Sequence, residues 1–273
     1  MKKSNLAVRM MTAAVAAPVI LSLLFLGPAW GWYTLVLAAT ALASQELFAM
    51  THAGDRVAQA LGVAGTVACS LGVYFGVHEP KLLITAILAV PILMGFTTIW
   101  RFESVEKAAL RLSTNMAAPF YIGALLATLA LLRRDHAEAG PALVLLCLLI
   151  SWMGDTGGFF FGKYLGKTKL HEVISPKKTR AGLVGSCVFA CLSAIAVQLT
   201  LLPSWPLWHI ALLGAAGGAV GQLGDLMESL LKRSTGVKDS GRLIPGHGGI
   251  LDRIDALLTV TPMIYLYALW QSG

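Results

Sequence analysis

The sequence predicts an all-α fold, a polytopic integral membrane helical bundle of about nine transmembrane helices. Of its 273 residues, 56% are hydrophobic and only 13% are charged, which is too apolar for a soluble domain of this length. The hydrophobic residues form continuous runs close to the twenty or so residues that a membrane-spanning helix needs, without the alternation that marks a spanning strand. We therefore expect helices joined by polar loops, and no strands.

The first apolar run, 11–27, follows three basic residues, as the core of a secretory signal does. It is longer than the usual signal core and further runs follow it, so we expect a retained first helix. Prolines inside later runs are compatible with membrane helices, because neighbouring helices satisfy the freed carbonyls. The small-residue stretch 214–221 predicts close packing of its helix. The other expected spans are 30–50, 57–77, 81–100, 114–132, 141–161, 182–202, 207–228 and 250–270, in one integral membrane domain over 1–273.

Lysine and arginine are unevenly distributed between the loops. With the N-terminus inside the cell, 18 of them fall in cytoplasmic segments, and only Lys81, Arg133 and Arg134 fall on the opposite side. Cytoplasmic loops of membrane proteins carry such an excess, so the polar loops 162–181 and 229–249 should share the cytoplasmic face. Because the basic residues stand in short loops between apolar runs, the formal charge of +7 indicates anionic lipid or nucleotide as the partner, and no nucleic acid.

Carboxylates flank a glycine-rich loop that lies within the polar segment 229–249. Asp225 precedes this loop, and Asp252 and Asp255 follow it at a spacing that places both on one helical face. Mg²⁺ is bound by one or two carboxylates together with phosphate oxygens, so these three residues are candidate metal ligands. The alternative is that Asp225 pairs with Lys232 and Asp252 with Arg253. Such ion pairs would leave the glycines of the loop unexplained.

Basic and hydroxyl side chains in two segments suit phosphate binding, since arginine and lysine both bind phosphate oxygens. The alternative is an ordinary cluster of solvated loop charges. The candidates around the glycine-rich loop are Ser229, Lys232, Arg233, Lys238 and Arg253, together with the acid Asp239 that follows Lys238. The candidates in the earlier loop are Ser175, Lys177, Lys178 and Thr179.

Four further polar residues give weaker signals. Asp155, near a predicted helix end, is a functional candidate because acids in membrane segments are costly, or else a capping residue. His247 stands between glycines, where it can contact phosphate, orient a carboxylate or shape a turn. Glu46 and Gln45, at the end of the second expected span, are interpreted as interfacial residues.

The segment 229–255 resembles the signature of the phosphatidate cytidylyltransferases, also called CDP-diglyceride synthases. That pattern runs from Ser-x-apolar-Lys-Arg through Lys-Asp to His-Gly-Gly-apolar-x-Asp-Arg-apolar-Asp, and the chain matches it throughout. The runs Ser-Pro-Lys-Lys-Thr and Gly-Asp-x-x-Glu-Ser also look like the family's. Two positions depart from it: Phe159 stands where tyrosine is common, and Ala181 where glutamate is common. The resemblance covers 141–273, whereas 1–140 match only in hydropathy.

This resemblance implies transfer of CMP from CTP to phosphatidate, giving CDP-diacylglycerol and pyrophosphate in phospholipid biosynthesis. It implies catalytic roles for Asp225, Asp252, Lys232, Arg233 and His247, with Mg²⁺ and a second cation such as K⁺ as cofactors. The expected setting is a bacterial-type inner membrane, with the active site facing the cytoplasm, in contact with membrane lipid. The expected assembly is a homodimer.

Two other functions stay open. A CTP-dependent lipid-alcohol kinase would transfer the γ-phosphate and release CDP, whereas a cytidylyltransferase releases pyrophosphate. An ion-coupled membrane transporter would use acids within the membrane. The sequence disfavours a transporter because it shows no repeats, and because its charges gather at one face of the predicted bundle.

Overall fold

The computed structural model describes residues 2–136, 138–243 and 248–272, with side chains described from Ala14 to Gln271. The chain packs as two compact units. The N-terminal unit comprises Met1–Leu131 and Thr235–Arg253, and the C-terminal unit comprises Leu132–Ser234 and Ile254–Gly273. The glycine-rich loop therefore packs with the N-terminal helices, although the sequence resemblance groups it with the later part of the chain. That both units form one membrane domain stays a prediction.

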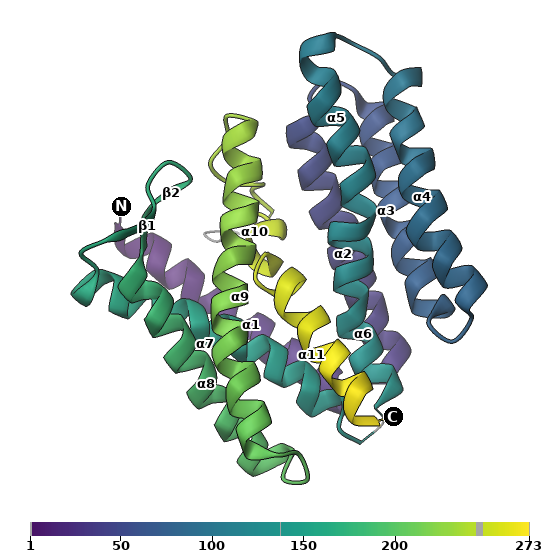
Figure 1. The fold of residues 1–273 in the computed structure, drawn as a ribbon. Coiled ribbons are helices and arrows are strands. Elements are labelled where there is room, and N and C mark those ends of the chain that lie inside the picture. Colours follow the sequence, from purple (N-terminus) through teal and green to yellow (C-terminus); the bar gives the residue numbers. More distant parts are fainter. Residues whose placement is uncertain (1, 137, 244–247, 273) are drawn as a thin grey trace. The chain divides into compact units, whose positions relative to one another are not determined.

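Figure 1 shows the helices of the N-terminal unit. They are α1 (Lys2–Leu26), α2 (Ala29–Thr51), α3 (Arg56–Gly76), α4 (Pro80–Trp100), α5 (Val105–Ala118), η1 (Pro119–Ala124), α6 (Leu125–Asp135, shared with the other unit from residue 132) and α10 (Leu251–Ile254, shared with the other unit at residue 254). α3 contacts both α2 and α4, and α5 packs on α4. η1 is a π-helical turn that begins at Pro119, which lacks an N–H for the regular ladder. The wider turn absorbs this defect, so the chain stays helical from α5 into α6.

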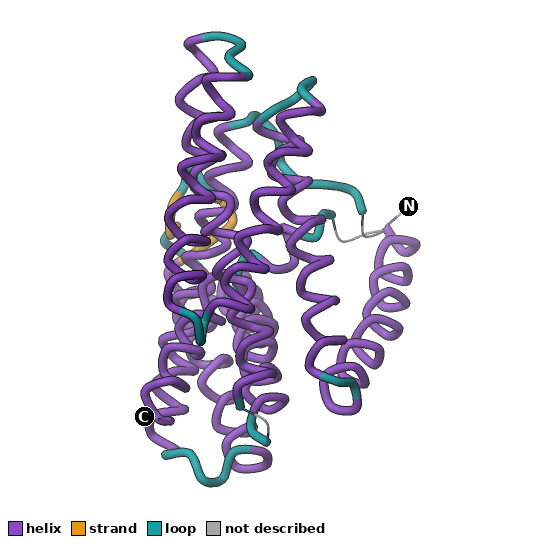
Figure 2. The backbone as a smooth tube through the Cα atoms, turned by 90° about the vertical axis from the view of Figure 1, so that its right-hand side faces the viewer, coloured by secondary structure: helices purple, strands orange, loops and turns teal. Residues whose placement is uncertain are grey.

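The C-terminal unit consists of helices and one short hairpin (Figure 2). Its elements are α7 (Gly140–Leu165), β1 (Lys169–His171), β2 (Ser175–Thr179), α8 (Arg180–Leu201), α9 (Leu207–Ser234) and α11 (Leu257–Ser272). The two strands pair antiparallel, with Lys169 opposite Thr179 and His171 opposite Ser175. The expectation of no strands is thus wrong for this loop. The hairpin lies in the polar segment between two apolar helices. Its backbone N–H and C=O groups are outside any helix, and they find partners by pairing between the two strands.

Glycines let α7, α8 and α9 approach one another closely. A Cβ added to Gly218 on α9 would lie 2.5 Å from the Ser186 carbonyl oxygen on α8. A Cβ added to Gly157 on α7 would meet the Gly185 carbonyl oxygen on α8. The Ser186 hydroxyl also donates to the Gly154 carbonyl oxygen at 2.7 Å. The close packing predicted from the small-residue stretch 214–221 is confirmed.

Seven helices among the described residues are long and apolar enough to cross a membrane. They match seven of the nine expected spans, and the chain is accordingly a polytopic membrane helical bundle. The helix that corresponds to the expected span 114–132 is longer than expected, because Val105–Asp135 is one continuous helical stretch. The first expected span corresponds to the shorter apolar helix Ala14–Leu26. The last is interrupted between α10 and α11, at residues 255–256. The full count of nine stays a prediction.

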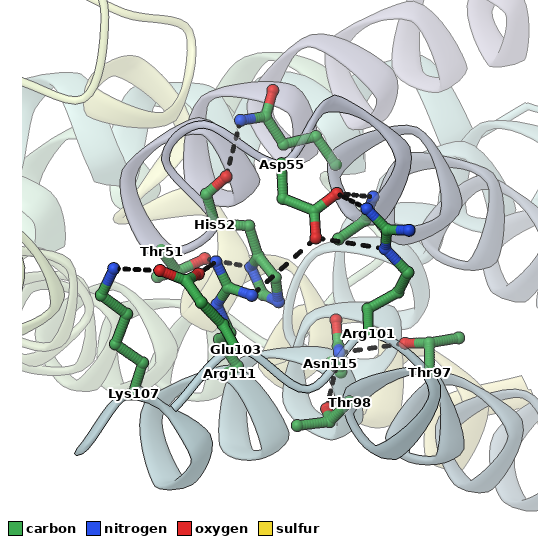
Figure 3. A network of polar contacts seen from close by, with 12 residues as sticks. Thr51, His52, Asp55, Thr97, Thr98, Arg101, Glu103, Lys107, Arg111 and Asn115 are labelled. Atoms are coloured by element: carbon green, nitrogen blue, oxygen red, sulfur yellow. Dashed lines mark hydrogen bonds and ion pairs between the residues drawn. The ribbon is translucent and has the colours of Figure 1, made fainter. Parts of the chain in front are cut away.

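A network of charged side chains joins the loop after α2 to the loop after α4 (Figure 3). Arg111 is only 3% exposed and forms ion pairs with Asp55 and Glu103. Arg101 donates to both carboxylate oxygens of Asp55, at 2.9 and 3.3 Å, and Lys107 pairs with Glu103. Each carboxylate thus meets two cations, which makes burial of the arginine tolerable. The network fixes the ends of three helices within the N-terminal unit.

His52, which follows α2, makes the stability of this unit depend on pH. Burial, followed by the positive charge of Arg111, lowers the pKa of His52 to about 4, while Asp55 and Glu103 act in the opposite direction. The Thr51 hydroxyl contacts His52 Nδ1 at 3.0 Å. Because the unfolded histidine has a pKa near 6.5, it takes up a proton between about pH 6.5 and 4 that the folded histidine does not. We expect stability to fall over this window by up to about 3 kcal/mol.

Thermal unfolding of the detergent-solubilised protein at pH 7.5 and at pH 4.5 measures this loss. The variant His52→Asn keeps a partner for Thr51 but does not titrate, so its melting temperature should change less between the two pH values. Burial also lowers the pKa of His136, so the comparison must be between variant and wild type. Equal pH dependence in both would contradict the assignment. Asp55 contributes only at lower pH, because its pKa lies below the usual carboxylate range.

Candidate functional site

A pocket of about 250 Å³ lies in the C-terminal unit, among α7, β2, the start of α8 and α9. Its wall carries lysines and carboxylates side by side. Such a wall suits an anionic ligand that binds together with a cation. The lining residues are Asp155, Gly158, Phe159, Lys177, Lys178, Thr179, Gly182, Gln222 and Asp225.

Lys178 and Asp225 form an ion pair on this wall. Lys178 Nζ lies 2.7 Å from Asp225 Oδ2 and donates to the Gln222 carbonyl oxygen at 3.0 Å. Local structure orients the lysine, because the next residue, Thr179, is the N-cap of α8. Its hydroxyl oxygen accepts from the Gly182 N–H at 3.0 Å. This cap fixes where β2 ends and α8 begins, and thereby where Lys178 is presented.

Three carboxylates converge in the same unit. One oxygen from each of Asp225, Glu228 and Asp255 lies within 4.8 Å of the others. Asp225 and Glu228 are three residues apart on α9, hence on one face. Gly224 allows Asp255 to approach, since a Cβ at Gly224 would lie 2.7 Å from the Asp255 carbonyl oxygen. Among the residues that the structure describes, these three carboxylates lie close enough together to hold a metal ion.

Lysines offset part of this negative charge. Lys232, 9% exposed, pairs with the fully buried Glu228 one turn earlier on α9. The Ser229 hydroxyl donates to Asp225 Oδ1 at 3.3 Å. The alternative that placed Lys232 on Asp225 is wrong: Lys178 pairs with Asp225 instead. Seven residues of helix separate Lys232 from Asp225 by about 10 Å, whereas Glu228 is one turn away.

The other candidates of this unit are placed as follows. Lys177 and Asp155 are exposed and line the pocket, as phosphate or cation contacts would. Ser175 is half-buried in β2. Arg233 is exposed, and its Nε donates to the Ile174 carbonyl oxygen at 3.4 Å. Thr179 is buried, and its hydroxyl oxygen serves the cap described above.

Asp252 organises the glycine-rich loop in the N-terminal unit. Its Oδ2 accepts from the Ser240 N–H at 3.1 Å, the Ser240 hydroxyl at 3.0 Å and the Gly249 N–H at 2.9 Å. Gly248 has φ +84°, and a Cβ there would lie 2.7 Å from Asp252 Oδ2. The glycine at 248 is therefore required by its positive φ and by the approach of this carboxylate.

Three more candidates are exposed in this unit: Lys238, Asp239 and Arg253. His247 lies outside the described residues. Asp252 belongs to the N-terminal unit and Asp225 to the other. A metal ion shared by these two carboxylates therefore stays a prediction.

Glu46, near the end of α2, contacts the same loop. Its Oε1 accepts from the Ile250 N–H at 2.9 Å, and its Oε2 accepts from the Leu251 N–H and from the Ser240 hydroxyl, each at 2.9 Å. The interpretation of Glu46 as an interfacial residue missed these contacts. A carboxylate near the end of α2 thus meets a loop about two hundred residues later in the sequence.

Comparison with known proteins identifies the family. The family model "Cytidylyltransferase family" matches residues 7–270, nearly the whole chain. The chain belongs to the cytidylyltransferase family. Relatives named phosphatidate cytidylyltransferase include those of Staphylococcus epidermidis (44% identity over 130 residues, 48% of this chain and 50% of the relative), Bacillus subtilis (43% over 132, 48% and 49%) and Synechocystis (44% over 139, 49% and 45%). The chain spans about half the length of the curated relatives it matches.

In this member of the cytidylyltransferase family, two carboxylates of interest were missed from sequence. Glu228 is not among the metal ligands predicted from the sequence, although its spacing of three from Asp225 places it on the same helical face. The signal for Glu46 was its charge near the end of an apolar run, where an acid is costly unless it has partners. The family's signature segment covers neither the loop's partner on α2 nor the pocket lysine, Lys178.

Proposed function

We propose that this chain is a phosphatidate cytidylyltransferase, which transfers CMP from CTP to phosphatidate and yields CDP-diacylglycerol and pyrophosphate. The observation that carries the proposal is the pocket wall on which Lys178 pairs with Asp225, a member of the carboxylate group with Glu228 and Asp255. Lysine suits phosphate oxygens and carboxylates suit a divalent cation, and a nucleoside triphosphate needs both. Membership of the family and the names of its bacterial relatives support the same activity.

In the proposed reaction, a phosphate oxygen of phosphatidate attacks the α-phosphorus of CTP in line. A new P–O bond forms while the bond from the α-phosphorus to the bridging oxygen of pyrophosphate breaks, and pyrophosphate leaves. The attacking oxygen is already ionised, so no side chain has to remove a proton. The protein contributes by positioning two phosphates and offsetting their charge. We assign these tasks to Lys177 and Lys178 in the pocket, and to Lys232 and Arg233 at the end of α9.

Mg²⁺ is the cofactor we propose, with Asp225 and Asp255 as its ligands. Their oxygens and that of Glu228 converge within 4.8 Å, which fits a metal that takes one or two carboxylates and completes its shell with phosphate oxygens and water. When bound, Mg²⁺ would offset the charge that develops on the phosphates. Asp252 stays a predicted ligand from the signature. A second cation such as K⁺ rests on the resemblance alone.

The proposed location is the cytoplasmic side of a bacterial inner membrane. CTP is water-soluble and phosphatidate is anchored in the bilayer, so the site has to lie near the interface. The excess of basic residues in the predicted cytoplasmic loops and the bacterial relatives support this location. A homodimer remains an expectation.

The test is a product assay with purified protein in mixed micelles of detergent and phosphatidate. With CTP labelled at the α-phosphate and Mg²⁺, label should pass into the lipid fraction as CDP-diacylglycerol, with one pyrophosphate released per transfer. A lipid-alcohol kinase would instead transfer the unlabelled γ-phosphate, so the label would stay in water-soluble CDP. A transporter would convert neither substrate. Either of these outcomes would exclude the proposed activity.

A further inference from the structure

The glycine-rich loop is held from outside the signature segment by a single side chain. Glu46 accepts hydrogen bonds from two consecutive backbone N–H groups, those of Ile250 and Leu251, at 2.9 Å each. It also accepts from the Ser240 hydroxyl at 2.9 Å. Hydrogen bonds to an ionised carboxylate are stronger than those between neutral groups. Both carboxylate oxygens are used, one for each amide, so the contact depends on the full charge-bearing group. We call these three contacts the Glu46 clamp.

The loop is built to admit the Glu46 carboxylate. A Cβ added to Gly241 or to Gly249 would collide with the carboxylate of Glu46. Both positions lie in the signature segment, where the glycines are otherwise unexplained. The glycine at 248 serves Asp252 instead, through its positive φ. Two carboxylates, from two ends of the sequence, thus account for three glycines of this loop.

The clamp is joined directly to Asp252. The Ser240 hydroxyl oxygen lies within hydrogen-bond distance of two acceptors, Glu46 Oε2 at 2.9 Å and Asp252 Oδ2 at 3.0 Å. Asp252 Oδ2 in turn accepts from the Gly249 N–H, the residue immediately before the two amides that Glu46 binds. A displacement of Glu46 would therefore release Ser240, Ile250 and Leu251 together, and with them the surroundings of Asp252.

We propose that Glu46 is a positioning residue of this enzyme, which holds the glycine-rich loop so that Asp252 is presented for catalysis together with Lys238 and Asp239, the exposed residues that precede Ser240. The inference rests on the proposed function for its catalytic meaning, but the clamp itself is a property of the fold. Glu46 acts through the loop and touches the backbone, so we assign it no contact with substrate.

A positioning role has a kinetic signature that differs from a loss of folded protein. If the loop is competent for only a fraction of the time, the apparent affinity for CTP and Mg²⁺ falls by that fraction. High ligand concentration then restores part of the lost rate. Misfolding, in contrast, lowers the turnover number of the sample and leaves KM unchanged.

The test uses Glu46→Gln, which keeps the size of the side chain but has only one accepting oxygen. Its amide nitrogen must face a backbone N–H or the Ser240 hydroxyl, so at least one bond of the clamp is lost. We expect hydrogen exchange of the amides at 249–251 to rise about tenfold or more, because a charge-assisted bond is lost. We expect KM for CTP and for Mg²⁺ to rise, with kcat/KM down roughly 10- to 100-fold, as for residues that orient metal ligands.

Gln45→Ala is the matched control. The exposed side chain of Gln45 donates to Gln59 Oε1 at 3.3 Å and takes part in none of the three clamp bonds, so exchange and kinetics should stay as in wild type. Wild-type exchange at 249–251 in folded Glu46→Gln would overturn the clamp. Faster exchange with unchanged KM and kcat would overturn the positioning role. If Glu46→Gln does not fold, Ser240→Ala removes one clamp bond from the other side, and wild-type exchange and KM there would overturn the proposal. Exchange needs no substrate, so an inactive wild-type protein would count against the proposed function alone.

Discussion

Replacing Asp225 by asparagine should reduce the proposed cytidylyl transfer about a thousandfold or more while the protein remains folded. Asp225 lines the pocket, pairs with Lys178 and belongs to the converging carboxylates. Asparagine removes the negative charge on which a bound divalent cation depends, and a metal contributes several kcal/mol to stabilising transferred phosphoryl charge. Turnover of labelled CTP over a range of Mg²⁺ concentrations measures the loss.

The fold should survive this change because asparagine keeps the volume of the side chain and an oxygen that can accept from Ser229. Lys178 loses a partner but keeps its bond to the Gln222 carbonyl oxygen. The melting temperature should therefore stay within a few degrees of wild type. Glu172→Gln is the matched control, since Glu172 is an exposed acid of the hairpin to which we assign no role. A folded Asp225→Asn variant with wild-type turnover would return the Lys178–Asp225 pair to a purely structural role.

Much of the fold could be predicted because membrane helices obey a length rule. Runs of about twenty apolar residues locate them, and Pro119 does not interrupt its helix because a π-helical turn absorbs it. The hairpin that carries Lys178 could not be located in this way, since its polar sequence has no periodicity to read. It depends on backbone pairing with β1 and on the cap at the start of α8.

Local contacts of the candidate site could be predicted from the sequence, and contacts between distant residues could not. Asp225 and Ser229 could be paired from sequence because four residues of helix bring them together, and their side chains lie 3.3 Å apart. The contact between Glu46 and the loop joins residues about two hundred positions apart, and no local pattern encodes it. Only the folded chain shows why the loop needs glycine at 249: the space of a Cβ there is filled by Glu46.

Replacing Asp252 by asparagine should abolish activity without disturbing the loop that surrounds it. All three hydrogen bonds from Ser240 and Gly249 converge on one oxygen, Oδ2. The asparagine oxygen can take the place of Oδ2, so these three hydrogen bonds keep their acceptor while the negative charge is lost. We expect activity below about a thousandth of wild type, because the anion is the part that the predicted metal or phosphate chemistry uses.

The informative comparison is between three loop variants. Asp252→Asn should show no activity with only a small rise in hydrogen exchange, confined to Gly249, because the charge is lost while the acceptor oxygen is kept. Glu46→Gln should show the reverse, faster exchange with residual activity that rises with ligand concentration. Asp252→Ala removes both charge and acceptor, so exchange and activity should both change. If Asp252→Asn instead exchanges like wild type and turns over CTP and phosphatidate at the wild-type rate, the carboxylate serves only to hold the loop. The chemistry would then rest on the carboxylates of α9 and Asp255.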